Sequence, residues 1–221
     1  MWSMPWFNTA EYNTVGLVIN IIGCIFWLIA YVILVRNIIV IKFVEMPAYV
    51  GGANFGWEFV YAFPYHPTTG LAFALAYIGA FFLDVYIYFN LFRYGHKQPI
   101  LKEFKKHLKP LLLANFTLWL LACYFFKRQG LDDGIGATSG YVINMIISIL
   151  CLVMMYRMND PSKFSLSFAW CRMLGSGLIG VSAAIFYPEN YFVMLLSGIC
   201  ILIDCTFISI LTKRKNGKAL A

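Results

Sequence analysis

The sequence predicts an all-α, polytopic integral membrane protein whose seven transmembrane helices place the N-terminus outside and the C-terminus in the cytoplasm. Of the 221 residues, 61% are hydrophobic and 12% are charged, whereas about 25% of the residues in an average globular domain are charged. A mean hydropathy of +0.74 leaves too little polar surface to cover a soluble core. We therefore expect one transmembrane domain over residues 1–221, with no separate soluble domain.

Seven apolar segments can be marked, and a segment needs about 20 mostly apolar residues to cross a bilayer. The connections between them are short, and most contain Pro, Gly or charged residues. The segments lie at residues 15–35, 47–63, 71–92, 109–126, 137–156, 166–187 and 190–212. Segment 47–63 is the weakest of them, and Gly51 and Gly52 interrupt it.

Basic residues are distributed unequally between the two predicted sides. Of the 17 Lys and Arg residues, 14 lie in the inner connections, Lys127 and Arg128 lie in an outer one, and Arg172 lies inside a span. This asymmetry satisfies the positive-inside rule. It also requires an odd number of spans, which supports segment 47–63. The net charge of +7 then reflects cytoplasmic loops, chiefly residues 102–109, and we expect no nucleic-acid partner.

Ionisable groups inside a membrane are costly, so each of them needs a reason. Three acids, Glu58, Asp84 and Asp204, fall within the predicted spans, together with one base, Arg172. Either aspartate could pair with Arg172. Three acids and one base cannot all be paired ions, so we expect at least one carboxyl group to be neutral or hydrogen-bonded.

Glu58 has the most informative surroundings. One face of segment 47–63 carries four side chains at the helical spacing i, i+3, i+4 and i+7, namely Asn54, Trp57, Glu58 and Tyr61. Such a face cannot point at lipid, so we expect it to line a cavity or to meet another polar face. A carboxyl group buried there would be largely protonated and could act as a Brønsted acid. The alternative is a polar cluster that only holds helices together.

No metal-dependent chemistry is indicated. The pair Asp132-Asp133 continues as Gly-Ile-Gly, so the D-D-x-x-D run of metal-dependent diphosphate ionisation is absent, and no D-x-D-D run occurs. The three histidines have no ligand spacing. We therefore expect no metal and no other cofactor.

The face Asn54-x-x-Trp57-Glu58-x-x-Tyr61, with the Pro64 and Pro67 region after it, resembles the membrane-integral terpene cyclases of fungal meroterpenoid and indole-diterpene pathways. These are the pyripyropene-type and paspaline-type cyclases, which have bacterial relatives. The stretch Arg172–Ser176 is similar to the family's Arg-x-Leu-Gly stretch, and Asp204 looks like the family's second essential acid. The resemblance covers nearly the whole chain.

The resemblance implies an enzyme that binds a prenylated aromatic, quinone or indole, protonates a terminal epoxide or alkene, and closes rings through carbocations. It implies that Glu58 is the proton donor and that Asp204 belongs to the acid machinery, with Asp84 as a third candidate acid. Residues expected to shape the pocket or stabilise cations are Asn54, Trp57, Tyr61, Tyr77 and Arg172, the last with a more structural role.

Two other functions fit the same residues. Intramembrane acids also serve proton-coupled transporters, although no inverted repeat is visible in the sequence. A non-catalytic lipid-binding protein would need only an aromatic pocket. In every case we expect a multi-pass membrane protein, in the endoplasmic reticulum of a eukaryote or the plasma membrane of a bacterium. The lipid bilayer would be a partner, and no obligate protein partner is expected.

Overall fold

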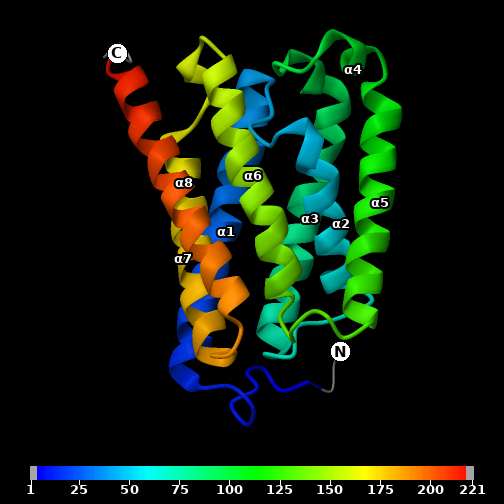
Figure 1. Ribbon diagram of the computed structural model, residues 1–221, viewed down its shortest axis with the longest axis vertical. Coiled ribbons are helices and arrows are strands. Elements are labelled where there is room, and N and C mark those ends of the chain that lie inside the picture. Colours follow the sequence, from blue (N-terminus) through cyan, green and yellow to red (C-terminus); the bar gives the residue numbers. More distant parts are fainter. Residues whose placement is uncertain (1–3, 218–221) are drawn as a thin grey trace.

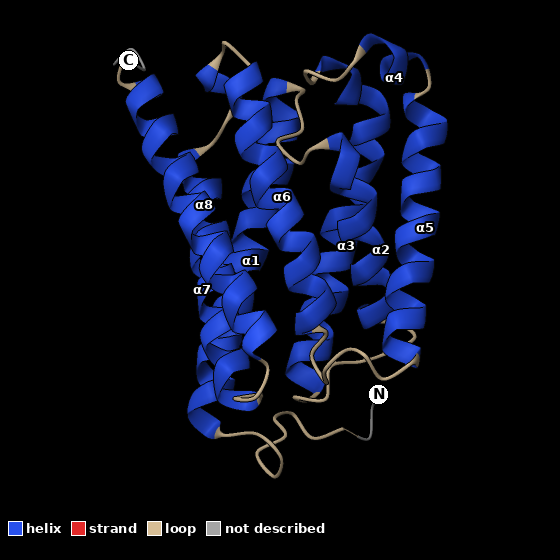
Figure 2. Ribbon diagram, in the orientation of Figure 1, coloured by secondary structure: helices blue, strands red, loops and turns tan. Residues whose placement is uncertain are grey.

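A computed structural model describes residues 4–217 and is all-helical over that part of the chain, with 78% helix and no strand (Figure 2). The α-helices are α1 (Thr14–Ile41), α2 (Ala48–Ala62), α3 (Leu71–Tyr94), α4 (Lys102–Lys106), α5 (Leu108–Arg128), α6 (Ala137–Arg157), α7 (Leu166–Phe186) and α8 (Tyr191–Lys215). Two short 3-10 helices, η1 (Gly95–Lys97) and η2 (Pro161–Lys163), lie in connections.

Side-chain caps explain where several helices begin. Asn13 accepts hydrogen bonds from the backbone N–H groups of Val15 and Gly16 at the start of α1, at 2.8 and 3.3 Å. Ser165 caps α7, and Asn190 caps α8 in the same way. Each cap satisfies a donor that the first helical turn leaves free.

Six helices are long and apolar enough to cross a membrane, namely α1, α3, α5, α6, α7 and α8. They coincide with six of the seven predicted segments. The remaining segment, predicted at 47–63, forms α2, whose 15 residues extend for roughly 22 Å at 1.5 Å per residue. Residues 102–109, which were predicted to be a cytoplasmic loop, contain the short helix α4, and α5 begins at Leu108.

Five of the long helices, together with the short α2, form a closed ring. Going round it, α1 packs on α7, α7 on α8, α8 on α6, α6 on α2, α2 on α3, and α3 on α1. Helix α5 lies outside this ring, where it packs against α2 at the edge of the bundle (Figure 1). The short α2 is therefore enclosed by protein, whereas α5 is the most exposed of the long helices.

Glycines allow two of the closest helix contacts. On α2, a Cβ added to Gly52 would lie 2.6 Å from the backbone nitrogen of Phe116, and one added to Gly56 would lie 2.9 Å from that of Leu120. These two glycines let the α5 backbone rest directly on α2, as small residues do between membrane helices. The interruption of segment 47–63 by glycine is thus a packing feature.

The outer surface of the bundle is apolar. Fewer than half of the residues in the most apolar stretch of each long helix are buried. Large side chains such as Leu118 on α5 and Leu202 on α8 are about two thirds exposed, at 67% and 70%. In water such a surface would aggregate, whereas lipid covers it at no cost. Together with the six long helices, it identifies a multi-pass membrane protein.

The connection between α1 and α2 is buried inside the bundle rather than solvated. Phe43, Val44, Glu45 and Met46 are all at most 2% exposed. The side chain of Gln98 satisfies this irregular backbone, because its amide donates to the carbonyls of Val44 and Met46 at 2.9 and 2.8 Å. Its carbonyl oxygen accepts from the N–H of Ala48 at 2.8 Å. Backbone that is buried without being helical needs such partners for its polar groups.

Candidate functional site

A pocket occupies the interior of the helix ring. The empty space of the pocket, including its open mouth, has a volume of about 870 Å³. The residues that line it come from α1, α2, α3, α7 and the start of α6. Most of the lining is apolar or aromatic, including Trp27, Leu28, Ile143 and Ile179. A mostly apolar cavity with a few convergent polar groups is typical of a small-molecule site.

Glu58 is the one acidic residue in the pocket lining, and its side chain is only 4% exposed. The phenol of Tyr31, on α1, donates a hydrogen bond to its Oε1 atom. The amide of Asn54 lies 3.4 Å from the same oxygen. The other oxygen, Oε2, is buried and has no hydrogen-bond partner. One oxygen of this carboxyl group is thus held in place and the other is left free.

Asn54 organises the group around Glu58. Its Nδ2 atom donates to the Tyr31 hydroxyl at 2.7 Å and to Oδ2 of Asp84 at 3.0 Å. Because Asn54 donates to that hydroxyl, the single hydrogen of Tyr31 is directed to Glu58. Asp84, on α3, is buried behind Asn54 and does not line the pocket. The structure therefore brings together three of the predicted residues, Asn54, Glu58 and Asp84, on two helices.

Aromatic rings form the wall beside Glu58. Trp57 and Tyr77 both line the pocket, and their ring centroids are 5.5 Å apart. The Tyr77 hydroxyl donates to the carbonyl of Ile135 at 3.0 Å, which fixes its ring against the start of α6. Tyr61, which was predicted for the same helix face, is fully buried behind Trp57 and lies outside the lining.

Asp204 and Arg172 form a separate buried pair. Arg172 on α7 donates to Oδ1 of Asp204 on α8 at 2.5 Å, and both side chains are 1% exposed. The guanidinium also donates to the Cys151 sulfur at 3.0 Å and lies 5.8 Å from the ring centroids of Phe168 and Phe207. Neither Arg172 nor Asp204 lines the pocket. Of the two aspartates that could pair with Arg172, Asp204 is the one that does.

The pair Asp132-Asp133 has a structural task at the start of α6. Asp133 accepts hydrogen bonds from the backbone N–H groups of Ile135, Ala137 and Thr138 at 2.8–3.0 Å. Burial raises the pKa of Asp133 above its usual value, and these N–H donors work against that rise. No group of three or more His, Cys, Asp or Glu side chains that could hold a metal ion occurs within residues 4–217.

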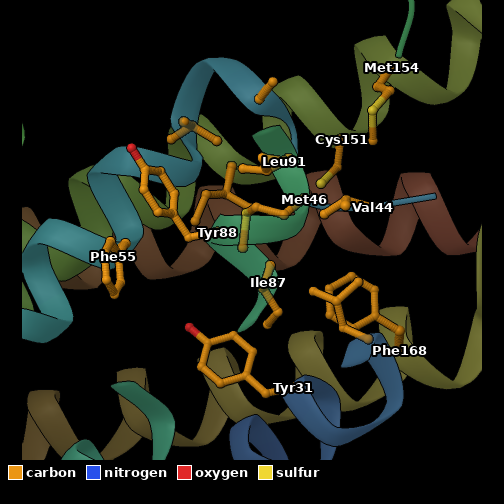
Figure 3. Packing of buried hydrophobic residues seen from close by; sticks show 14 of the residues in the cluster. Tyr31, Val44, Met46, Phe55, Ile87, Tyr88, Leu91, Cys151, Met154 and Phe168 are labelled. Carbon is orange, nitrogen blue, oxygen red and sulfur yellow. The ribbon is translucent and has the colours of Figure 1, made fainter. Parts of the chain in front are cut away.

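Tyr31 is a site residue that the sequence did not reveal, and Trp27 in the pocket lining is another. Tyr31 lies in the apolar first span, where a single tyrosine looks like ordinary packing. In the structure it packs in the same buried cluster as Phe55 of α2 and Ile87 and Tyr88 of α3 (Figure 3). The only available signal was Trp27, one helical turn earlier, which also lines the pocket and packs on the Tyr31 ring at 5.5 Å.

The comparison with protein families agrees with this architecture. The family described as Pyr4-like transmembrane terpene cyclases matches residues 7–215. That range contains α1 to α8 in full, and it confirms the resemblance noted from the Asn54–Tyr61 face and the last two spans. No curated protein and no solved structure matches the chain. The match supports an enzyme role, and the chain belongs to the Pyr4-like transmembrane terpene cyclases.

Proposed function

We propose that this protein is a metal-independent terpene cyclase in which Glu58 protonates the terminal epoxide or alkene of a prenylated aromatic substrate. One observation carries the proposal. Glu58 is the acid of an otherwise mostly apolar pocket, with Oε1 bound by Tyr31 and Oε2 unpartnered. A carboxyl group kept neutral in such surroundings can act as a general acid.

The hydrogen-bond directions favour an acidic proton on Oε2 of Glu58. Oε1 accepts the Tyr31 hydrogen, so an acidic proton of Glu58 belongs on Oε2. Burial disfavours the charged carboxylate, and a second carboxyl group nearby disfavours it further. Asp84 supplies that second group through Asn54, which bonds to both. Asp84 is thus proposed to keep Glu58 protonated without contacting the substrate.

The reaction then balances without any added reagent. The Oε2 proton is transferred to the epoxide oxygen or to the terminal alkene carbon, and the chain's π bonds close rings as the positive charge moves along it. The final cation loses a proton, and the Glu58 carboxylate regains one, so the product is an isomer of the substrate. The faces of Trp27, Trp57 and Tyr77 would stabilise the intermediate cations. The apolar lining would exclude the water that quenches them.

Asp204 is proposed to act structurally rather than as a second donor. Its partner is Arg172, and it does not line the pocket. The pair instead joins α7 to α8 next to the ring interior. Arg172 and Tyr61 are likewise proposed to support the pocket from behind, whereas Asn54, Trp57 and Tyr77 would contact or shape the substrate.

The proposed topology has seven passes with the N-terminus outside. It is supported by the enclosure of α2 among α3, α5 and α6, and by the basic residues at the ends of α3 and α8. Lys213, Arg214 and Lys215 in the last turn of α8 would then be cytoplasmic, as the positive-inside rule requires. The proposed location is the endoplasmic reticulum of a eukaryote or the plasma membrane of a bacterium.

The proposal is tested with membranes that contain the protein. They are offered farnesylated and geranylgeranylated phenols and indoles, each as alkene and as terminal epoxide, in the presence of EDTA. We expect a cyclised product of unchanged mass, and the accepted form identifies the initiating group. Conversion of no substrate, combined with pH-driven uptake into proteoliposomes, would contradict the proposal and favour a transporter. Binding without conversion would favour a lipid-binding role.

A further inference from the structure

We infer that Asp132, which lies outside the pocket, is a positioning residue that fixes the indole of Trp57 through Ser139 and so sets which ring closures the pocket favours. The orientation of Trp57 by Asp132 and Ser139 does not depend on any activity. Its effect on ring closure rests on the proposed cyclase function.

A continuous hydrogen-bond chain joins the three residues. The Trp57 indole N–H donates to the Ser139 hydroxyl at 2.9 Å. The Ser139 hydroxyl donates in turn to Oδ2 of Asp132. The same Oδ2 accepts the hydroxyl hydrogen of Tyr61 at 2.5 Å. Oδ2 of Asp132 is therefore linked by hydrogen bonds to two neighbouring aromatic side chains of α2, to Tyr61 directly and to Trp57 through Ser139.

Asp132 is itself held rigidly. Its other oxygen, Oδ1, accepts from the backbone N–H groups of Asp133 at 3.0 Å and Thr138 at 3.1 Å. It stands at the N-terminal end of α6, where the helix dipole stabilises a negative charge. Because Oδ1 is anchored to the helix, Oδ2 is aimed at a fixed point between Tyr61 and Ser139.

The indole has little freedom left. Its ring lies 4.8 Å from that of Tyr61 and 5.5 Å from that of Tyr77. On the α6 side, a Cβ added to Gly140 would come within 3.2 Å of the indole. Two rings and a helix backbone thus flank Trp57, which also lines the pocket, and the hydrogen bond to Ser139 selects its orientation.

This arrangement bears on the chemistry in two ways. The orientation of Trp57 decides which part of a bound polyene chain meets the face of the indole. An N–H that donates toward a carboxylate also becomes polarised along the chain of hydrogen bonds, which leaves more electron density on the ring face for a cation. Losing the chain should therefore change the distribution of cyclised products rather than abolish protonation by Glu58.

The test compares Ser139→Ala with Thr138→Val, which removes a neighbouring hydroxyl that bonds to Asp133 instead. The protein is labelled with 5-fluorotryptophan in detergent, and the Trp57 resonance is assigned from its loss in Trp57→Phe. We expect Ser139→Ala to shift that resonance and Thr138→Val to leave it in place. Ser139→Thr, which restores the hydroxyl, should return it toward the wild-type position. An unmoved Trp57 resonance in Ser139→Ala would overturn the inference, whether or not a substrate is known.

The second readout is the ratio of cyclised products from the substrate that the wild type converts. We expect Ser139→Ala to change the ratio of the main product to the others by about two- to tenfold, the range set by one hydrogen bond. Thr138→Val should keep the wild-type ratio. A shifted resonance with an unchanged ratio would contradict the role in product choice. Failure of the cyclase proposal itself would appear separately, as no cyclised product from the wild type.

Discussion

Arg172 and Asp204 form a buried ion pair, and mutating it can show whether Asp204 has a structural or a catalytic role. Replacing Asp204 with Asn leaves the guanidinium without its counter-ion at a place where both side chains are 1% exposed. The Cys151 sulfur, 3.0 Å away, is a weak acceptor and does not replace a carboxylate. The variant should therefore be strongly destabilised.

The size of the effect follows from the depth of the pair. Removing one partner of a buried ion pair costs about 3–5 kcal/mol, which is a large share of the 5–15 kcal/mol by which proteins are typically stable. For a chain of this size, this corresponds to a melting temperature lower by roughly 6–20 °C. Removing both charges in Arg172→Met/Asp204→Leu leaves no buried charge, so stability should return to the wild-type level or above it.

The assay is thermal unfolding in detergent, followed by cyclisation activity. The matched control is Asp160→Asn, because Asp160 forms an exposed pair with Lys163 at 3.8 Å, and such pairs contribute less than about 1 kcal/mol. A melting temperature of Asp204→Asn equal to that of the control would refute the reasoning about buried charge. A stable double variant that converts no substrate would refute the structural role and return Asp204 to the acid machinery.

Three further predictions concern other parts of the fold. Tyr31→Phe should slow cyclisation by about two- to tenfold, because it removes one hydrogen bond to Glu58, and product formation over time measures this. Gly136→Ala should lower the melting temperature, because Gly136 has φ of 73° and a Cβ there would lie 2.5 Å from the Tyr61 ring. Burial raises the pKa of Glu45 from 4.5 to about 7, so the folded protein binds this proton more tightly than the unfolded chain. The free energy of unfolding should then fall by about 3 kcal/mol as the pH rises from the lower of these pKa values to the higher. Glu45→Gln should make the melting temperature depend less on pH over this interval.

Apolar length was sufficient to predict most of the fold. Six of the seven predicted segments lie on helices long enough to span a membrane, with ends shifted by a few residues. The largest shift is in α1, which continues to Ile41 rather than ending near residue 35. Arg36 and Asn37 are polar and made the end of this span look like a loop, but Asn37 points inward and donates to Glu45 at 3.3 Å. A hydropathy profile cannot predict this hydrogen bond between Asn37 and Glu45.

The site was predicted in part, because local spacing reveals a helix face but not what faces it. The Asn54–Tyr61 spacing predicted one helix face that would line a cavity or meet another polar face. In the structure Asn54, Trp57 and Glu58 lie in the pocket lining, whereas Tyr61 lies outside it. Which aspartate pairs with Arg172 depends on the order of helices around the ring, and sequence reasoning left this open. Tyr31 and Glu45 were missed for the same reason, since their partners come from other helices and loops.

The measurement that tests the central claim most directly compares cyclisation by Glu58→Gln with that of the wild type. The matched control is Glu103→Gln, because Glu103 is an exposed acid on α4. Unchanged thermal unfolding would show that Glu58→Gln is folded, and mass spectrometry with chromatography would quantify the cyclised isomer. We predict product from the wild type and from Glu103→Gln, and none from Glu58→Gln. A folded Glu58→Gln that forms the cyclised isomer at the wild-type rate would contradict the assignment of Glu58 as the proton donor.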